Sequence, residues 1–115
     1  MDQEMNAWVK NFPGAITVTD ANGIIIAMND ASAESFKEDG GLELIGKDVR
    51  ACHPGLARNK IEDLLNKREE NVYTIEKHGK KKLIYQVPWT NNGQYAGFIE
   101  LSLVIPFDMP HFLRD

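Results

Sequence analysis

The segment TDANGIIIAMNDASA, residues 19–33, has the pattern of a tight turn between two strands that leads directly into a helix start. In the turn, the Asp20 side chain can accept a hydrogen bond from the backbone two residues on, and Gly23 tolerates a positive φ. The three isoleucines that follow favour a return to extended chain. Either Asn29 or Asp30 can then accept backbone N–H bonds and cap the next helix. The segment therefore predicts a β-hairpin followed by a capped helix.

The order of these residues resembles the opening of a PAS domain, which reads D-x-x-G-x-I, a few residues, and then N-x-A. The matching places are held by Asp20, Gly23, Ile25 and the run Asn29-Asp30-Ala31, with Asp30 where the family commonly has Pro. The run 44–48, LIGKD, resembles the hydrophobic-Gly-Lys segment of that family, and 95–101 resembles its last strand. PAS domains are mostly sensor or interaction modules, so the resemblance implies a signalling role.

The composition of this 115-residue chain is that of a single globular domain. Apolar residues make up 43%, charged residues 26%, and the net charge is −4, so no basic face indicates a nucleic-acid partner. The basic run 80–82 is expected to be a solvated hairpin tip. Because the N-terminus is acidic and no long apolar run is present, we expect neither a signal peptide nor a membrane-spanning helix. With Cys52 alone, internal disulfides are excluded, and we expect a bacterial-type cytoplasmic protein.

Hydrophobic periodicity predicts a short N-terminal helix followed by the order β-β-α-α-α-β-β-β. The expected helices are 2–12, 30–37, an irregular segment around 42–49, and 56–69; the expected strands are 15–20, 23–28, 71–78, 81–89 and 95–105. This is an α+β chain. The resemblance implies a PAS fold, with a five-stranded antiparallel sheet and helices packed on one face. We expect an N-terminal helix or cap at 1–13, the PAS domain at 14–105 and a tail at 106–115.

The tail, residues 106–115, carries two prolines close together and so does not predict a coiled-coil linker to another domain. Together with the initiating Met1, this favours a stand-alone protein over an excised domain. The apolar residues of the tail predict that it docks back on the domain, or else binds a partner.

Apolar residues recur at alternate positions in the three C-terminal strands and predict one apolar sheet face. Packing alone explains a filled core, whereas the resemblance implies a small-molecule pocket between this face and the helices. The pocket candidates are Ile61, Leu64, Leu65, Tyr73, Ile75, Tyr85, Val87, Trp89, Ile99 and Leu101. Of these, Tyr73, Tyr85 and Trp89 would supply polar groups to an apolar lining.

The opposite sheet face is predicted to expose apolar side chains as well, which is typical of an interface. An N-terminal stripe at helical spacing is the candidate to cover it and, as the family resemblance implies, to help form a homodimer. The interface candidates are Met5, Trp8, Val9, Phe12, Ile84, Phe98 and Val104. Glu100 is expected on this outer face as a carboxylate that contacts water.

The family resemblance also allows specific cofactors to be considered. The proximal histidine of PAS haem sensors falls near Ile61, which cannot bind iron, and His53 is the only weak candidate nearby. Val49 stands where light-sensing relatives have their reactive cysteine, which excludes cysteinyl-flavin photochemistry and leaves non-covalent flavin open. The histidines and Cys52 lack metal-ligand spacing.

No catalytic motif is present, so we do not expect an enzyme. The sequence leaves two other functions. The chain is predicted to be a small-molecule sensor whose ligand affects dimer or partner contacts, with a signalling protein as a possible partner. The alternative is a ligand-free dimerisation or protein-interaction module.

Overall fold

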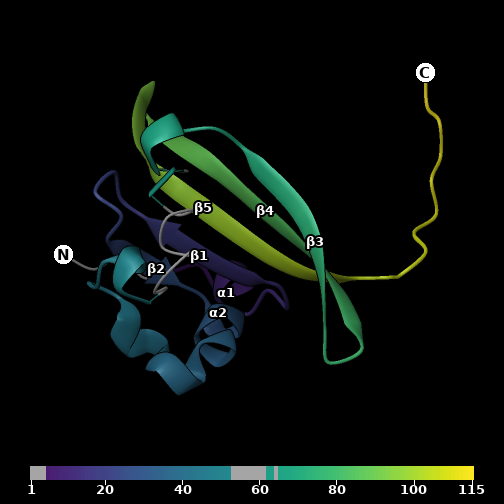
Figure 1. Cartoon of the computed structure of the whole chain (residues 1–115), viewed down its shortest axis with the longest axis horizontal. Coiled ribbons are helices and arrows are strands. Elements are labelled where there is room, and N and C mark those ends of the chain that lie inside the picture. Colours follow the sequence, from purple (N-terminus) through teal and green to yellow (C-terminus); the bar gives the residue numbers. More distant parts are fainter. Residues whose placement is uncertain (1–4, 53–61, 64) are drawn as a thin grey trace.

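The computed structural model describes residues 5–52, 62, 63 and 65–115, and is built around one five-stranded antiparallel sheet (Figure 1). The strand order is β2-β1-β5-β4-β3. The strands are β1 Ala15–Thr19, β2 Ile25–Met28, β3 Asn71–Lys77, β4 Lys80–Asn91 and β5 Gln94–Ile105. The helices are α1 Ala7–Lys10 and α2 Asp30–Ser35, with 3₁₀ turns η1 Lys37–Asp39, η2 Gly41–Leu44 and η3 Val49–Cys52. The predicted α+β architecture is confirmed.

The helix predicted at 56–69 lies partly outside the described residues. Within them, Glu62, Asp63 and residues 65–67 are helical. None of the helices in the described ranges is long and apolar enough to cross a membrane.

The turn between β1 and β2 forms as its residues predict. The Asp20 carboxylate accepts hydrogen bonds from the backbone N–H groups of Asn22 (2.9 Å) and Ile24 (3.0 Å). Gly23 has a φ of 84°, a conformation that favours glycine. Arg50 donates to the Asn22 carbonyl oxygen at 2.8 Å, which ties the turn to η3.

Asn29 caps α2 and also joins it to two other segments. Its side-chain oxygen accepts from Ser32 N (3.0 Å) and from Ile16 N (2.9 Å). Its side-chain nitrogen donates to the carbonyl oxygens of Gly14 (2.9 Å) and Val9 (3.2 Å). The residue is 1% exposed, so this amide holds α1, β1 and α2 together from inside the protein.

Two tight turns set the register of the C-terminal strands. Lys77 pairs with Lys80 around a turn in which His78 and Gly79 both have positive φ. Asn92 and Gly93 form the second turn in the same way. Such two-residue turns match the twist of antiparallel strands.

A bulge interrupts the pairing of β4 and β5 near the second turn. Trp89 pairs with Gly97 but Thr90 pairs with Tyr95, so Ala96 is the extra residue on β5. Gly97 has a φ of 143°, and a Cβ at this position would collide with the Thr19 carbonyl oxygen on β1. The glycine therefore allows β5 to lie close to β1.

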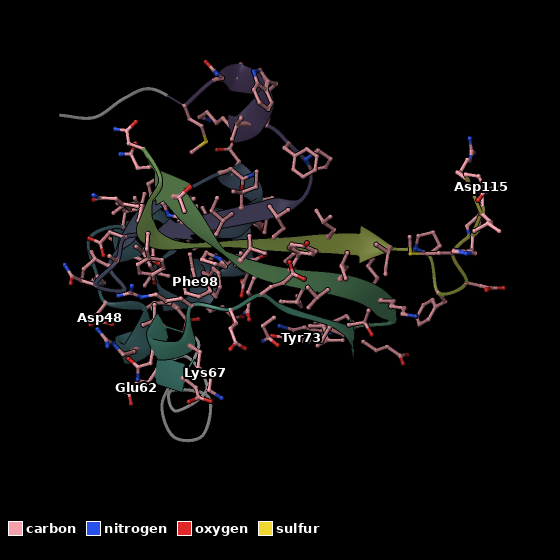
Figure 2. All side chains as sticks on the ribbon, turned by 90° about the horizontal axis from the view of Figure 1, so that it is seen from above. Asp48, Glu62, Lys67, Tyr73, Phe98 and Asp115 are labelled. Carbon is pink, nitrogen blue, oxygen red and sulfur yellow. The ribbon has the colours of Figure 1, made fainter. Side chains whose placement is uncertain are left out.

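The inner face of the sheet is the one that α2 covers. Thr17 on β1 points to this face, because its hydroxyl lies 2.6 Å from the buried hydroxyl of Ser32 on α2. Ile84 and Phe98 are buried on the same face. The helical residues around Glu62 and Lys67 lie on this side in Figure 2, and α1 lies on the other side, which we call the outer face.

The tail does not dock on the described part of the domain, contrary to expectation. From Pro106 the chain extends away from the sheet (Figure 1), and Asp115 lies far from it in Figure 2. Phe112 and Leu113 are 69% and 85% exposed. One hydrogen bond, from Lys81 Nζ to the Phe107 carbonyl oxygen (3.4 Å), holds its first residues.

Candidate functional site

A row of polar side chains crosses the inner face of the sheet. Asn71 on β3, Gln86 on β4, Glu100 on β5 and Thr17 on β1 are successive register partners. Asn71 donates to Gln86 Oε1 at 2.8 Å, and Gln86 donates to Glu100 Oε2 at 2.6 Å. The hydroxyl pair of Thr17 and Ser32 extends the row to α2. An inner sheet face is ordinarily apolar, and the half-buried Glu100 carboxylate in the middle of this one has the Gln86 amide as its partner.

A groove of about 200 Å³ lies beside this row, toward the turn between β3 and β4. Its apolar wall is formed by Ala15, Phe36, Ile75 and Ile84, and its polar groups belong to Ser35, Tyr73, Lys77, Lys82, Glu100 and Ser102. Apolar walls with a few polar groups that face the same space are typical of small-ligand sites. The α2 helix and strands β1, β3, β4 and β5 all contribute, so the site is formed by the fold and not by one loop.

The Tyr73 hydroxyl belongs to both the row and the groove. Burial and the charge of Glu100 raise the pKa of Tyr73 above its ordinary value, and a hydrogen bond from Gln86 opposes them. The hydroxyl is therefore protonated at neutral pH and can donate to a ligand.

The two lysines mark the open end of the groove. Lys82 on β4 is half-buried and lies opposite Ile75 on β3 and Val104 on β5. Lys77 is the last residue of β3 and is exposed. Neither forms an ion pair with any acidic side chain of the described residues. This end of the groove is therefore positively charged, while Glu100 is negatively charged deeper along the sheet.

The predicted pocket residues divide between the two faces. Tyr73 and Ile75 line the groove. The other strand candidates, Tyr85, Val87, Trp89, Ile99 and Leu101, lie on the outer face, because Tyr85 pairs with Leu101 and Val87 with Ile99, one residue out of phase with the inner row. The expectation that all of them share one face with Tyr73 is wrong, because Tyr73 lies opposite Ile84.

The remaining pocket candidates belong to the predicted long helix. Ile61 and Leu64 lie outside the described residues. Leu65 is half-buried, and its side chain lies beside Gly23 in the turn between β1 and β2.

The outer-face candidate Trp89 has a structural role. Its Nε1 donates to the Thr19 carbonyl oxygen at 3.0 Å, which links β4 to β1 across β5.

The predicted interface residues divide in the same way. Ile84 and Phe98, at 6% and 8% exposure, are buried on the inner face, so their placement on an outer face is wrong. Val104 is at a position of β5 that alternates with Glu100 and Ser102 and so points to the inner face, but near the end of the strand it is 60% exposed. Around α1, Met5 and Val9 are half-buried, while Phe12 and Trp8 are 40% and 74% exposed.

Glu100 and Gln86 were not identified as site residues from the sequence. Glu100 was expected to face water on the outer face, but it lines the inner groove and accepts a hydrogen bond from Gln86. The signal that could have found them is that two polar residues interrupt otherwise apolar strands and lie at paired positions once the turns fix the register. The bulge also places Tyr95 on the inner face, where its ring lies edge-on to Phe98 at 6.1 Å and under Arg68 at 4.2 Å.

The cofactor residues considered from the sequence receive little structural support. Val49 is in η3 and packs beside the core of Ile25, Met28 and Leu44. His53 lies outside the described residues. Among those that the structure describes, no group of three or more His, Cys, Asp or Glu side chains could hold a metal ion.

No protein-family model and no curated protein matches this chain. Solved structures do match. The PAS domain from Bordetella pertussis BvgS is 26% identical, with a TM-score of 0.62 over 89% of this chain and 84% of its own. A C-terminal domain from Streptococcus mutans is 18% identical with a TM-score of 0.69, and the match covers 90% of this chain and 92% of that domain. The Aer2 receptor from Vibrio cholerae, a dual PAS-heme oxygen sensor, is 17% identical with a TM-score of 0.63. This match covers 81% of this chain and 95% of the receptor structure.

Proposed function

Because the chain folds as a PAS domain, we propose that it is a sensory module that binds a small molecule in the groove on the inner face of the sheet. The observation that carries this proposal is the hydrogen-bonded row of Asn71, Gln86 and Glu100 beside an open groove. Half-buried polar groups on an otherwise apolar face cost stability unless they are hydrogen-bonded, and such networks often serve recognition or specificity. We further propose that the module acts in the cytoplasm and has no catalytic activity of its own.

Native mass spectrometry of the full chain, with an absorbance spectrum of the same sample, tests the proposal. Ser102→Trp fills the groove, because Ser102 is half-buried in its lining. Thr74→Trp is the matched control, since Thr74 is exposed and has the outer phase of β3. We expect a bound mass with the wild type and Thr74→Trp, and its loss with Ser102→Trp. A bound mass that persists in Ser102→Trp contradicts the assignment of the groove.

A second proposed function is homodimerisation through the outer face. The supporting observation is the apolar, half-buried series Tyr85, Val87, Ile99 and Leu101, together with Trp8 on α1 at 74% exposure. A large aromatic side chain this exposed beside an apolar sheet face is typical of an association surface. The occupant that we propose is a second copy of this chain, which would make dimerisation the output of the sensor.

Trp8→Asp and Val104→Asp form a matched pair for this second proposal. Both replace an exposed apolar residue, but Trp8 belongs to α1, which lies on the outer side of the sheet (Figure 2), whereas Val104 is at a position of β5 that points to the inner face. Sedimentation equilibrium is expected to show a dimer for the wild type and Val104→Asp, and a folded monomer for Trp8→Asp. The reverse pattern would place the interface at Val104, and a monomeric wild type would remove the proposal.

A further inference from the structure

The charges along the groove have an order that restricts what it can bind. The register places Lys77 and Lys82 at one end and Glu100 at the other, with Ile84 between them, and Phe36 adds to the apolar lining. The positively charged end favours an anionic group on the ligand, since a carboxylate or phosphate can accept from both ammonium groups.

The deeper end requires the opposite chemistry. Glu100 already accepts from Gln86, but an ionised carboxylate has acceptor capacity on both oxygens and no donor. A ligand group that faces Glu100 must therefore donate a hydrogen bond, as an ammonium, amide or hydroxyl does. An anionic group here would be repelled and would leave the carboxylate without a further partner.

The register gives the approximate length of the ligand. Glu100 is opposite Gln86, which lies four residues from Lys82 on β4. At about 3.4 Å per residue, the backbone positions of the two ends are roughly 14 Å apart. The Lys82 and Glu100 side chains both extend into the groove and occupy part of that length. A volume of about 200 Å³ then suits one short organic molecule.

We propose that the groove binds a small organic molecule with an anionic group at one end, a hydrogen-bond donor at the other and a short apolar body between them. The anionic group contacts Lys82 and Lys77, the apolar body packs on Phe36 and Ile84, and the donor contacts Glu100. This inference rests on the proposed sensory function, because it assigns a ligand class to the same groove.

Three probes separate the two ends of the ligand. 6-Aminohexanoate has both charged groups, hexanoate lacks the donor, and hexylamine lacks the anion. We would titrate each into ¹⁵N-labelled full chain and follow backbone amide shifts. The expected result is that 6-aminohexanoate binds about tenfold more tightly than either parent, with the largest shifts in residues that line the groove. Equal affinities for the three probes, or shifts confined to the outer face, would overturn the proposal.

Two variants with matched controls assign the ends. Lys82→Ala is expected to reduce the affinity for 6-aminohexanoate toward that for hexylamine, with Lys77 still present at the same end. Lys80→Ala should have no effect, because Lys80 is the exposed first residue of β4 and does not line the groove. Glu100→Gln should reduce it to about that for hexanoate, and Glu76→Gln, exposed on β3, should not. Loss of binding in either control variant would refute the assignment of that end.

The failure of this inference can be distinguished from the failure of the proposed function. If no probe binds but a copurified mass is present and is lost in Ser102→Trp, the ligand class is wrong and the sensory site stands. If no probe binds and no mass copurifies, both are refuted.

Discussion

Replacing Asn29 with alanine should lower the free energy of unfolding by about 3–7 kcal/mol. The change removes the side-chain cap of α2, which costs about 1 kcal/mol. It also leaves the Ile16 N–H group and the Gly14 carbonyl oxygen without their side-chain partner. A buried polar group without a partner costs about 1–3 kcal/mol. Domains are stable by about 5–15 kcal/mol in total, so this single amide accounts for a large share.

Asn29→Asp separates the two halves of the amide. The carboxylate keeps both acceptor roles, toward Ser32 N and Ile16 N. It loses the donor to Gly14 and places a negative charge against that carbonyl oxygen. We therefore expect a loss for Asn29→Asp that differs measurably from that of Asn29→Ala, with α2 itself retained.

Urea unfolding followed by far-UV circular dichroism and by tryptophan fluorescence measures these losses. Asn11→Ala is the control, because Asn11 is an exposed asparagine at the end of α1. A loss below about 1 kcal/mol for Asn29→Ala would refute the reasoning, since it would equal that of an ordinary surface substitution. A loss of the same size in Asn11→Ala would show that asparagine content, and not the position of Asn29, sets the stability.

Three further results follow from the fold and its electrostatics. Gly97→Ala should destabilise by about 2–4 kcal/mol and lower Tm, because the added Cβ collides with the Thr19 carbonyl oxygen at a positive φ; an unchanged Tm would contradict the close approach. Arg68→Ala should cost about 0.5–1 kcal/mol of the cation–π contact and raise the pKa of Tyr95, because Arg68 lowers it now; ultraviolet titration measures this change, and an unchanged or lower Tyr95 pKa would contradict it. The pKa of Tyr73 is raised in the folded protein, so the folded protein holds the hydroxyl proton more tightly than the unfolded chain does. The protonated Tyr73 therefore contributes stability below the unfolded pKa of about 10, and this contribution is lost as pH rises through the folded pKa. Tyr73→Phe should flatten this loss in urea unfolding curves between neutral pH and pH above 10, and an unchanged pH slope would refute it.

The local turns could be predicted from the sequence because each depends on a few neighbouring residues. Asp20 and Gly23 make the first turn, and Asn92 and Gly93 make a later one, through side-chain acceptors and positive φ that act within a few positions. The cap at Asn29 is of the same kind, although its bonds to Gly14 and Val9 depend on the tertiary fold.

The faces of the sheet could not be predicted so directly. Alternation shows which residues of one strand share a face, but not which face the helices cover. For β3 and β4 the answer was available, because a two-residue turn at His78 and Gly79 places Tyr73 opposite Ile84. For β5 it was not, because the bulge at Ala96 shifts the phase by one residue and no local pattern indicates it.

The position of β5 provides a physical route between the two proposed functions. Glu100 points to the groove, while its neighbours Ile99 and Leu101 point to the outer face. A ligand that binds Glu100 and shifts its position also shifts the β5 backbone that carries Ile99 and Leu101, and so changes the arrangement of the outer face. If so, the coupling is reciprocal: the ligand must favour or oppose the dimer, and dimerisation must change ligand affinity in the same direction. Ligand titrations of the wild type and of monomeric Trp8→Asp, with dimer dissociation constants measured with and without ligand, test both directions. Equal ligand affinity in monomer and dimer would show that the groove and the interface act independently.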